Sequence, residues 1–255
     1  KESPQPHRTE DRETLKQRAL ELAGNDASMR AWVETLFSNV HETLYRLGSS
    51  VMFKPKARKV YADIVSALLE DCDPDVRMAA LMTLGELREM SCSAAIARHI
   101  EDPSGNVRVA SVRALGQLRD KSVSPILLKL LDHKDLDMRY DVIQALAALE
   151  DKTAIPSIAR CLDDRDQGVR WAAAEALGKL GDKPSIPRLT ELLEDEVPLV
   201  RSRAAGALAA LGAKSSAQGI VRLLEDEITA VDAARALGTL GERSIVPSIV
   251  KLLDD

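Results

Sequence analysis

Residues 164–194 read DRDQGVRWAAAEALGKLGDKPSIPRLTELLE, and the chain repeats this pattern every 31 residues. The segments 102–132, 133–163 and 195–225 carry the same Val-Arg or Met-Arg pair, the same Ala-Leu pair, and later a Leu-Leu or Cys-Leu pair. The arginine of the first pair marks the register, and it falls at Arg77, Arg108, Arg139, Arg170 and Arg201. A fixed period of this size indicates one supersecondary unit that is copied and stacked, with a long surface in place of a central pocket.

Each copy is predicted to fold as two helices. The first is short, as in residues 124–131, and Pro125 near its start suits the first turn of a helix, where a missing N–H costs little. The second is longer, as in residues 169–180, where apolar side chains at helical spacing form one buried stripe and alanines let neighbouring helices approach closely. Gly181 follows the last leucine, and a glycine there commonly ends a helix in the left-handed conformation.

The two ends of the chain depart from this regular pattern. Residues 1–10 are polar with two prolines, and we expect them to be disordered. Residues 11–58 carry apolar residues such as Leu15 and Leu22 at helical spacing but match the repeat poorly, so we expect a divergent N-terminal helical cap. The repeat array is expected to cover residues 59–255.

The last repeat is irregular. The step from Leu208 to Leu237 is 29 residues, and the register arginine is missing. This predicts a changed superhelical twist or a looser joint near residues 226–232. A first helix is expected at residues 246–253 with no second helix after it, so the last repeat is expected to be truncated.

The composition argues against several classes of partner. Residues 1–59 hold 11 basic and 8 acidic residues, a balance of +3, whereas the remainder holds 24 and 32, a balance of −8. An acidic array argues against sequence-independent nucleic-acid binding, which depends on many phosphate contacts. The apolar runs are too short to span a bilayer, and the three cysteines lack the C-x-x-C spacing of a zinc site. We therefore expect a cytoplasmic protein without nucleic-acid or membrane partners.

Residues 73–85, which read DPDVRMAALMTLG, and their copies resemble the HEAT repeat, in particular its short PBS-lyase HEAT-like subclass. The resemblance covers roughly residues 60–255 and implies an all-α, right-handed α-solenoid of two-helix repeats. It also implies that the register arginines link neighbouring repeats through the turn aspartates, which are Asp71, Asp102, Asp164 and Asp195. Since His133 takes the aspartate position of one copy, a weaker link is expected there.

Catalytic motifs are not evident. The four histidines show no metal-ligand spacing, and the sequence contains no nucleophile-elbow, P-loop or dinucleotide-binding motif. Deoxyhypusine hydroxylases of the same fold carry repeated His-Glu pairs, whereas this chain has the single pair His41-Glu42. We therefore predict no catalytic residue, no metal and no cofactor.

A binding surface is expected instead on the outward stripe of the second helices, which should line the concave face. The stripe is the set at spacing i, i+4, i+8: Met78, Met82, Glu86, Val109, Arg113, Gln117, Tyr140, Gln144, Ala148, Trp171, Glu175, Lys179, Ser202, Gly206, Ala210, Val231, Arg235 and Thr239. These positions vary between copies while the buried ones hardly do, as expected of a surface selected for a partner. The predicted partner-binding residues are Met78, Met82, Val109, Arg113, Tyr140, Gln144, Trp171, Glu175 and Lys179.

Tyr140 and Trp171 are the only aromatic residues in 71–255, and they occupy equivalent positions of adjacent copies. Aromatic residues are enriched at binding hot spots. Two interpretations stay open: the pair forms an exposed apolar ridge, or it packs against the next helix and fills space.

These features favour a non-enzymatic protein-binding scaffold or adaptor, which would dock a helix or an extended segment of a partner on its concave face. The alternative is a subunit of a phycobilin lyase-type enzyme, because some PBS-lyase-type proteins attach or remove phycobilins. A designed repeat protein is a third possibility, but the irregular N-terminus and the 29-residue step argue against it. The sequence does not indicate the oligomeric state.

Overall fold

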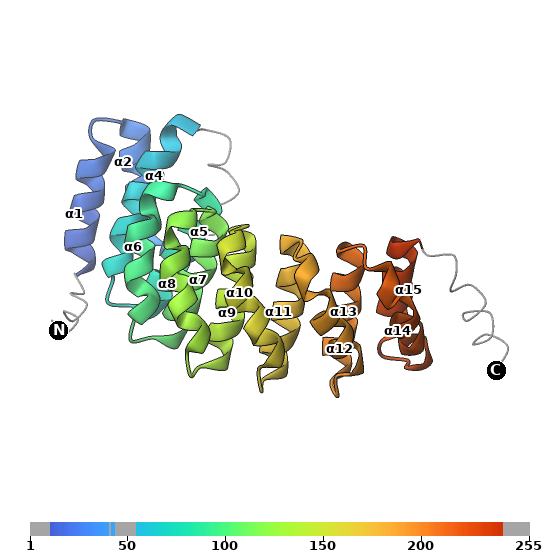
Figure 1. The fold of residues 1–255 in the computed structure, drawn as a ribbon. Helices are drawn as coiled ribbons and strands as arrows, with labels where there is room; N and C mark the ends of the chain where they lie inside the picture. Colours follow the sequence, from blue (N-terminus) through green and yellow to red (C-terminus); the bar gives the residue numbers. More distant parts are fainter. Residues whose placement is uncertain (1–10, 41, 44–54, 242–255) are drawn as a thin grey trace. The chain divides into compact units, whose positions relative to one another are not determined.

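The computed structural model describes residues 11–40, 42–43 and 55–241 (Figure 1). The chain divides into two compact units between Val123 and Ser124. Within these ranges the regular structure consists of α-helices and short 3-10 helices, without a strand. The all-α fold is therefore confirmed. The disordered tail predicted for residues 1–10 and the helix predicted for residues 246–253 lie outside the described residues.

The first unit contains the predicted cap and the first repeats. Its helices are α1 (Arg12–Ala23), α2 (Ala27–Ser38), α4 (Pro55–Ala67), α5 (Pro74–Leu87), α6 (Ser93–Ala97) and α7 (Gly105–Leu118). Helix α1 packs on both α2 and α4. Leu22 is 44% exposed, contrary to expectation, because the buried stripe of α1 is centred on Ala19 and Ala23 and Leu22 falls at its edge.

The second unit repeats one helix pair. Its helices are α8 (Ser124–Lys129), α9 (Leu136–Ala148), α10 (Ile155–Arg160), α11 (Gln167–Leu180), α12 (Ile186–Glu191), α13 (Pro198–Ala210), α14 (Ala217–Arg222) and α15 (Ala230–Leu240). Each first helix is shorter than predicted, because its last turn tightens into a 3-10 helix, as at Leu130–Asp132 after α8.

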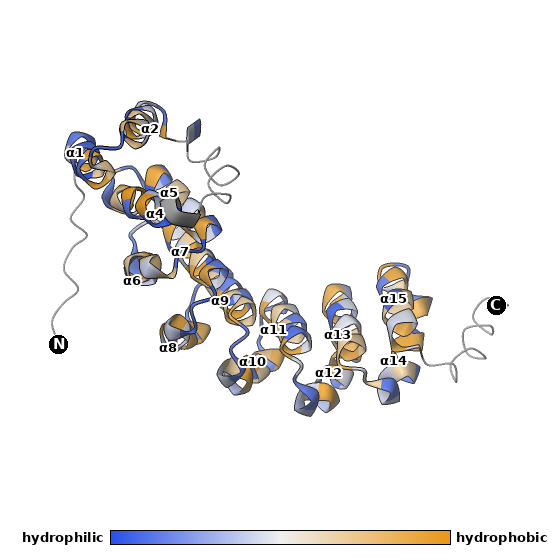
Figure 2. Cartoon of the chain, turned by 90° about the horizontal axis from the view of Figure 1, so that it is seen from above, coloured by the Kyte–Doolittle hydropathy of each residue, from blue (hydrophilic) through white to orange (hydrophobic). Residues whose placement is uncertain are grey.

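The helices of the second unit form two layers. Figure 2 shows the second helices α9, α11, α13 and α15 side by side in one row, with the first helices α10, α12 and α14 in a second row along one side of it. Apolar residues such as Val169, Leu177 and Leu189 are fully buried between the layers. The chain is thus an α-solenoid in which each second helix is covered by its own first helix and by the neighbouring second helices.

Small residues set the spacing between second helices. A Cβ added to Gly178 of α11 would lie 2.9 Å from the Cα of Ala207 in α13, and one added to Gly85 of α5 would lie 3.0 Å from the Cα of Ala114 in α7. Ordinary carbon contacts are about 3.5–4.0 Å. The close approach predicted from the small residues is therefore confirmed in both units.

The second helices end in a left-handed residue at the same repeat position. Gly181, Gly212 and Gly241 adopt φ values of 75°, 68° and 60° there, as predicted. Three non-glycine residues also occupy it with φ values of 51–57°, namely Arg88, Arg119 and Glu150. A side chain in this conformation costs energy that glycine avoids, so the early repeats end their helices less favourably.

The register arginines join neighbouring repeats along the turns, as the family resemblance implied. The Nε and Nη2 groups of Arg170 donate to the two carboxylate oxygens of Asp195 at 2.8 and 3.0 Å, and its Nη1 donates to the backbone carbonyl of Asp164 at 3.0 Å. Asp195 also accepts a hydrogen bond from the amide of Val197 at 2.9 Å. The same ion pair recurs as Arg77–Asp102, Arg139–Asp164 and Arg201–Asp226.

The most buried of these links joins Arg77 to Asp102, whose side chains are 9% and 1% exposed. Both of its hydrogen bonds measure 2.9 Å. Burial acts to raise the pKa of the Asp102 carboxyl, but the hydrogen bonds from Arg77 and from the Ser104 amide outweigh it and hold the pKa below its ordinary value. The charged form of Asp102 therefore stabilises the first unit.

His133 replaces the turn aspartate at the start of the second unit. Its Nδ1 accepts a hydrogen bond from the Asp135 amide at 3.1 Å, which is the bond that a carboxylate makes at the other turns. Arg108 of the first unit donates to the backbone carbonyl of Asp102 at 2.8 Å. Since Arg108 and His133 belong to different units, the weaker link expected between them stays a prediction.

The predicted cap region contacts the first repeat through an arginine that the sequence pattern did not reveal. The Nε of Arg12 donates to Asp71 Oδ2 at 3.1 Å, so Arg12 acts as a register arginine would. Trp32 and Tyr61 make a T-shaped contact with ring centroids 4.8 Å apart. These contacts connect α1, α2 and the first helix of the array.

The irregular last joint keeps its link to the preceding repeat. Asp226 still pairs with Arg201. The missing arginine is replaced in part by Thr229, a fully buried residue whose hydroxyl donates to the carbonyl of Leu223 at 2.7 Å. Thr229 thereby satisfies a carbonyl six residues back, as each register arginine does. The changed twist expected near residues 226–232 stays a prediction.

Candidate functional site

The outward sides of the second helices carry a groove in each unit. In the first unit a groove of about 210 Å³ lies between α5 and α7. All six stripe positions of these helices line it: Met78, Met82, Glu86, Val109, Arg113 and Gln117. Met82 is 55% exposed. The predicted stripe of this unit therefore encloses a partly apolar groove with a polar rim.

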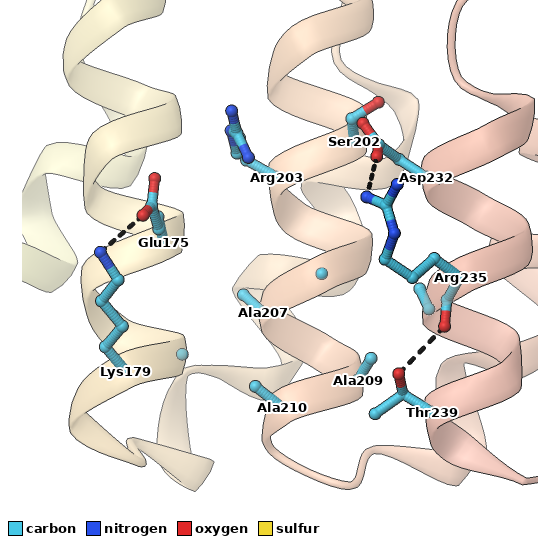
Figure 3. A pocket seen from close by; sticks show the side chains of 13 residues that line it. Glu175, Lys179, Ser202, Arg203, Ala207, Ala209, Ala210, Asp232, Arg235 and Thr239 are labelled. Atoms are coloured by element: carbon cyan, nitrogen blue, oxygen red, sulfur yellow. Dashed lines mark hydrogen bonds and ion pairs between the residues drawn. The ribbon is translucent and has the colours of Figure 1, made fainter.

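The second unit carries a larger groove of about 400 Å³ over α11, α13 and α15 (Figure 3). Its floor consists of small residues, mainly glycine and alanine such as Gly178, Gly206 and Ala207. Stripe residues form its walls, among them Glu175 and Lys179. Because the floor side chains are so small, the larger residues of neighbouring helices stand around an open space.

The charges of this second groove are almost all paired. The Lys179 ammonium lies 2.6 Å from the Glu175 carboxylate, and the Arg235 guanidinium lies 2.6 Å from Asp232. Arg203 is exposed and, within the described part of the chain, has no carboxylate within ion-pair distance. Figure 3 shows it extending from α13 into the space that faces α11. The groove thus has one uncompensated positive charge.

An aromatic cluster lies beside this charge. The rings of Tyr140 in α9 and Trp171 in α11 have centroids 4.9 Å apart and planes inclined at 54°. The Cζ of Arg203 lies 5.4 Å from the centroid of the Trp171 ring, within the range of a cation–π contact. Both rings are half-buried, so they pack on each other and still present a partly exposed face.

Eight of the nine predicted site residues therefore fall into three groups, and Gln144 belongs to none of them. Those of the first unit line one groove, Glu175 and Lys179 line the other, and Tyr140 and Trp171 form the aromatic contact. Gln144 is half-buried in α9.

The stripe reading needs two corrections around α13. Ser202 is only 6% exposed, because its short side chain lies below its larger neighbours at the groove floor. Arg203 was missed, although a signal was present in the sequence. Its repeat position holds alanine in three other copies, at Ala79, Ala110 and Ala172.

All three cysteines are free thiols, and they form no disulfide. Cys92 and Cys161 are buried and Cys72 is exposed. Burial raises the pKa of Cys161 to about 11. In the described ranges no group of three or more His, Cys, Asp or Glu side chains is arranged to hold a metal. The described helices also include none with the length and apolar character needed to cross a membrane.

Solved structures share this fold at low sequence identity. A chain from the complex of CpcE and CpcF of phycocyanin lyase from Nostoc sp. PCC7120 is 23% identical, with a TM-score of 0.52 over 94% of this chain and 97% of that one. YibA of Escherichia coli is 20% identical, with a TM-score of 0.54 over 90% and 82%. A designed armadillo repeat protein in complex with the peptide (KR)4 is 18% identical, with a TM-score of 0.52 over 77% and 99%. The comparison with curated proteins gave no match.

Family models identify the repeats themselves. The model for HEAT repeats matches residues 61–147, 124–209 and 158–233, which together cover more than half of the chain. The model for the PBS lyase HEAT-like repeat matches residues 230–255. These matches agree with the helix pairs, with the 31-residue period and with the ion pairs between register arginines and turn aspartates. The chain therefore belongs to the HEAT-repeat family, and its residues 230–255 match the PBS lyase HEAT-like repeat.

Proposed function

We propose that this protein is a non-enzymatic scaffold that docks a segment of a partner protein on the outward faces of its second helices. The observation that carries the proposal is the groove over α11, α13 and α15, whose walls are built from positions that differ between the copies. By contrast, the core residues and the ion pairs between register arginines and turn aspartates repeat nearly unchanged from copy to copy. Variation along the walls of an open groove fits a surface that recognises something outside the chain.

The aromatic cluster supplies the anchors for such a partner. Tyr140 and Trp171 support each other in a fixed geometry, so little side-chain freedom is lost when a partner covers them. Truncation of an aromatic anchor of this kind to alanine often costs about 2 kcal/mol or more of binding free energy. Arg203 contacts Trp171 and also lines the groove, so the groove continues the aromatic surface over α13 and α15.

A displayed library of random peptides tests this proposal. Peptides selected on the full chain are measured by fluorescence anisotropy against the Tyr140→Ala/Trp171→Ala double variant. Ile126→Ala serves as a matched control, because Ile126 is an exposed apolar residue of a first helix. We expect the double variant to lose roughly tenfold or more in affinity, while the control keeps it. Equal binding by a folded double variant would overturn the proposal.

A second candidate function is the handling of a bilin chromophore. It is favoured by the match of residues 230–255 to the PBS lyase HEAT-like repeat. Mixing the chain with a free bilin and recording the visible absorbance spectrum separates the two functions. A spectral shift that saturates with protein would support chromophore handling, whereas an unchanged spectrum would leave the scaffold role.

A further inference from the structure

We infer that the groove over α11, α13 and α15 binds an acidic peptide segment, with a side-chain carboxylate of that segment held by Arg203. The inference rests on the proposed function and goes further, because it names the chemistry of the partner.

The charged residues that line the groove indicate whether its ligand is acidic or basic. Two of the three cations, Lys179 and Arg235, are each neutralised by a carboxylate on their own helix at 2.6 Å. Arg203 is left without such a carboxylate among the described residues. A basic segment would meet this free guanidinium and find both groove carboxylates already paired. An acidic segment would supply the charge that the groove lacks.

The setting of Arg203 prepares it to bind a carboxylate. Its guanidinium carbon lies over the Trp171 ring, 5.4 Å from the ring centroid, so the aromatic ring holds the cation in place. A cation–π contact does not use up the N–H donors of the guanidinium, and these form paired hydrogen bonds with carboxylates. Because the aromatic contact already restricts the long side chain, less side-chain entropy is lost when the ligand arrives.

The shape of the floor accommodates a peptide backbone. Glycine and alanine line the space between the three helices, and the groove encloses about 400 Å³. Neighbouring packed helices are about 8–10 Å apart, so three of them span roughly 20 Å. An extended chain covers that distance with about six residues. A short segment with small or aliphatic residues beside its acidic residue fits this space.

The acidic character of the whole array does not oppose this inference. Residues 60–255 carry a net charge of −8. Exposed charges farther away than about 8 Å are largely screened at physiological ionic strength. The nearest charges therefore decide which ligand is accepted, and in this groove they leave a positive surplus.

Three pools of labelled octapeptides provide the probes. All have acetylated and amidated ends and small or aliphatic flanks, and the central residue is Asp or Glu, Asn or Gln, or Lys or Arg. Binding to the full chain is measured by fluorescence anisotropy at low and high salt. We expect the acidic pool to bind roughly tenfold more tightly than the neutral pool and to weaken as salt rises.

Two charge variants make the test specific. Arg203→Gln is expected to remove the preference for the acidic pool. Arg222→Gln removes the same charge from α14 outside the groove, where Arg222 is 70% exposed, and should leave the preference intact. Far-ultraviolet circular dichroism confirms that both variants are folded.

The outcomes separate this inference from the scaffold proposal. Equal binding of the acidic and neutral pools, preferred binding of the basic pool, or an acidic preference retained by Arg203→Gln would each overturn the assignment of Arg203. If library peptides still depended on Tyr140 and Trp171 in that case, the scaffold proposal would stand alone. A fourth pool with free C-termini and neutral centres distinguishes a terminal carboxylate, and tighter binding of that pool than of the acidic pool would overturn the side-chain assignment.

Discussion

Replacing Gly178 by alanine is expected to destabilise the second unit, whereas the same change at Gly206 is expected to stabilise it. The two glycines lie inside neighbouring second helices, α11 and α13. A Cβ at Gly178 would lie 2.9 Å from the Cα and 3.0 Å from the Cβ of Ala207, and no described atom lies within 4 Å of a Cβ at Gly206. The pair therefore separates interhelical contact from helix propensity.

The magnitudes follow from these two environments. In the interior of a helix, alanine is favoured over glycine by about 0.5–1 kcal/mol. At Gly178 the added methyl group overlaps backbone, which cannot rotate away, and overpacking of this kind costs about 1–3 kcal/mol. The propensity gain is common to both variants. The difference between their unfolding free energies thus isolates the contact between α11 and α13 and should be about 1–3 kcal/mol.

Urea unfolding measures this difference. Trp171 lies on α11 with Gly178, so its fluorescence reports the helix that carries the change, and a Trp32→Phe background removes the other tryptophan. Midpoints are compared because repeat arrays can unfold in more than one step. If Gly178→Ala were as stable as Gly206→Ala, close packing at this position would not be what fixes the spacing of the helices.

Arg88→Gly is expected to raise the free energy of unfolding by about 0.5–1 kcal/mol, because Arg88 adopts a φ of 51°; an unchanged urea midpoint would contradict this. Stability is expected to fall in acid, because the lowered folded-state pKa of Asp102 contributes stability above about pH 4 that is lost as pH falls through that pKa. Asp102→Asn should flatten this dependence in an acid titration followed by circular dichroism. In mild alkali a thiol reagent is expected to modify one cysteine quickly, the exposed Cys72, because burial raises the pKa of Cys92 and Cys161; two fast thiols would refute this.

The fold could be predicted because each copy of the repeat tests the others. The 31-residue period predicted a helix pair in each copy, and Gly181 predicted where the second helix ends. The exceptions have physical reasons. Arg88 also ends its helix in the left-handed conformation, but an arginine gives no local signal for that geometry. The turn position, repeated from copy to copy, imposes it.

The candidate site could be predicted only in part. The stripe at spacing i, i+4, i+8 found six of the nine residues that line the groove of the first unit. It missed Arg203, because that residue lies in the column beside the stripe. It missed Arg12 as the partner of Asp71, because Arg12 lies outside the periodic array and has no register. A linear pattern ranks exposure along one helix, but it does not show which residues of neighbouring helices enclose a space.

Different residues of a repeat hold the fold and line the groove, so the side chains of the groove can change without loss of the fold. Arg170 uses three of its nitrogen atoms at the turns, on the carbonyl of Asp164 and on the carboxylate of Asp195. Gly178 and Ala207 fix the distance between the helices from within. Neither set of contacts includes Arg203. A charge change at Arg203 should therefore alter which segment binds and cost only its contact with Trp171, about 0.5–1 kcal/mol, whereas a change at Arg170 should lower the unfolding midpoint of the unit much further.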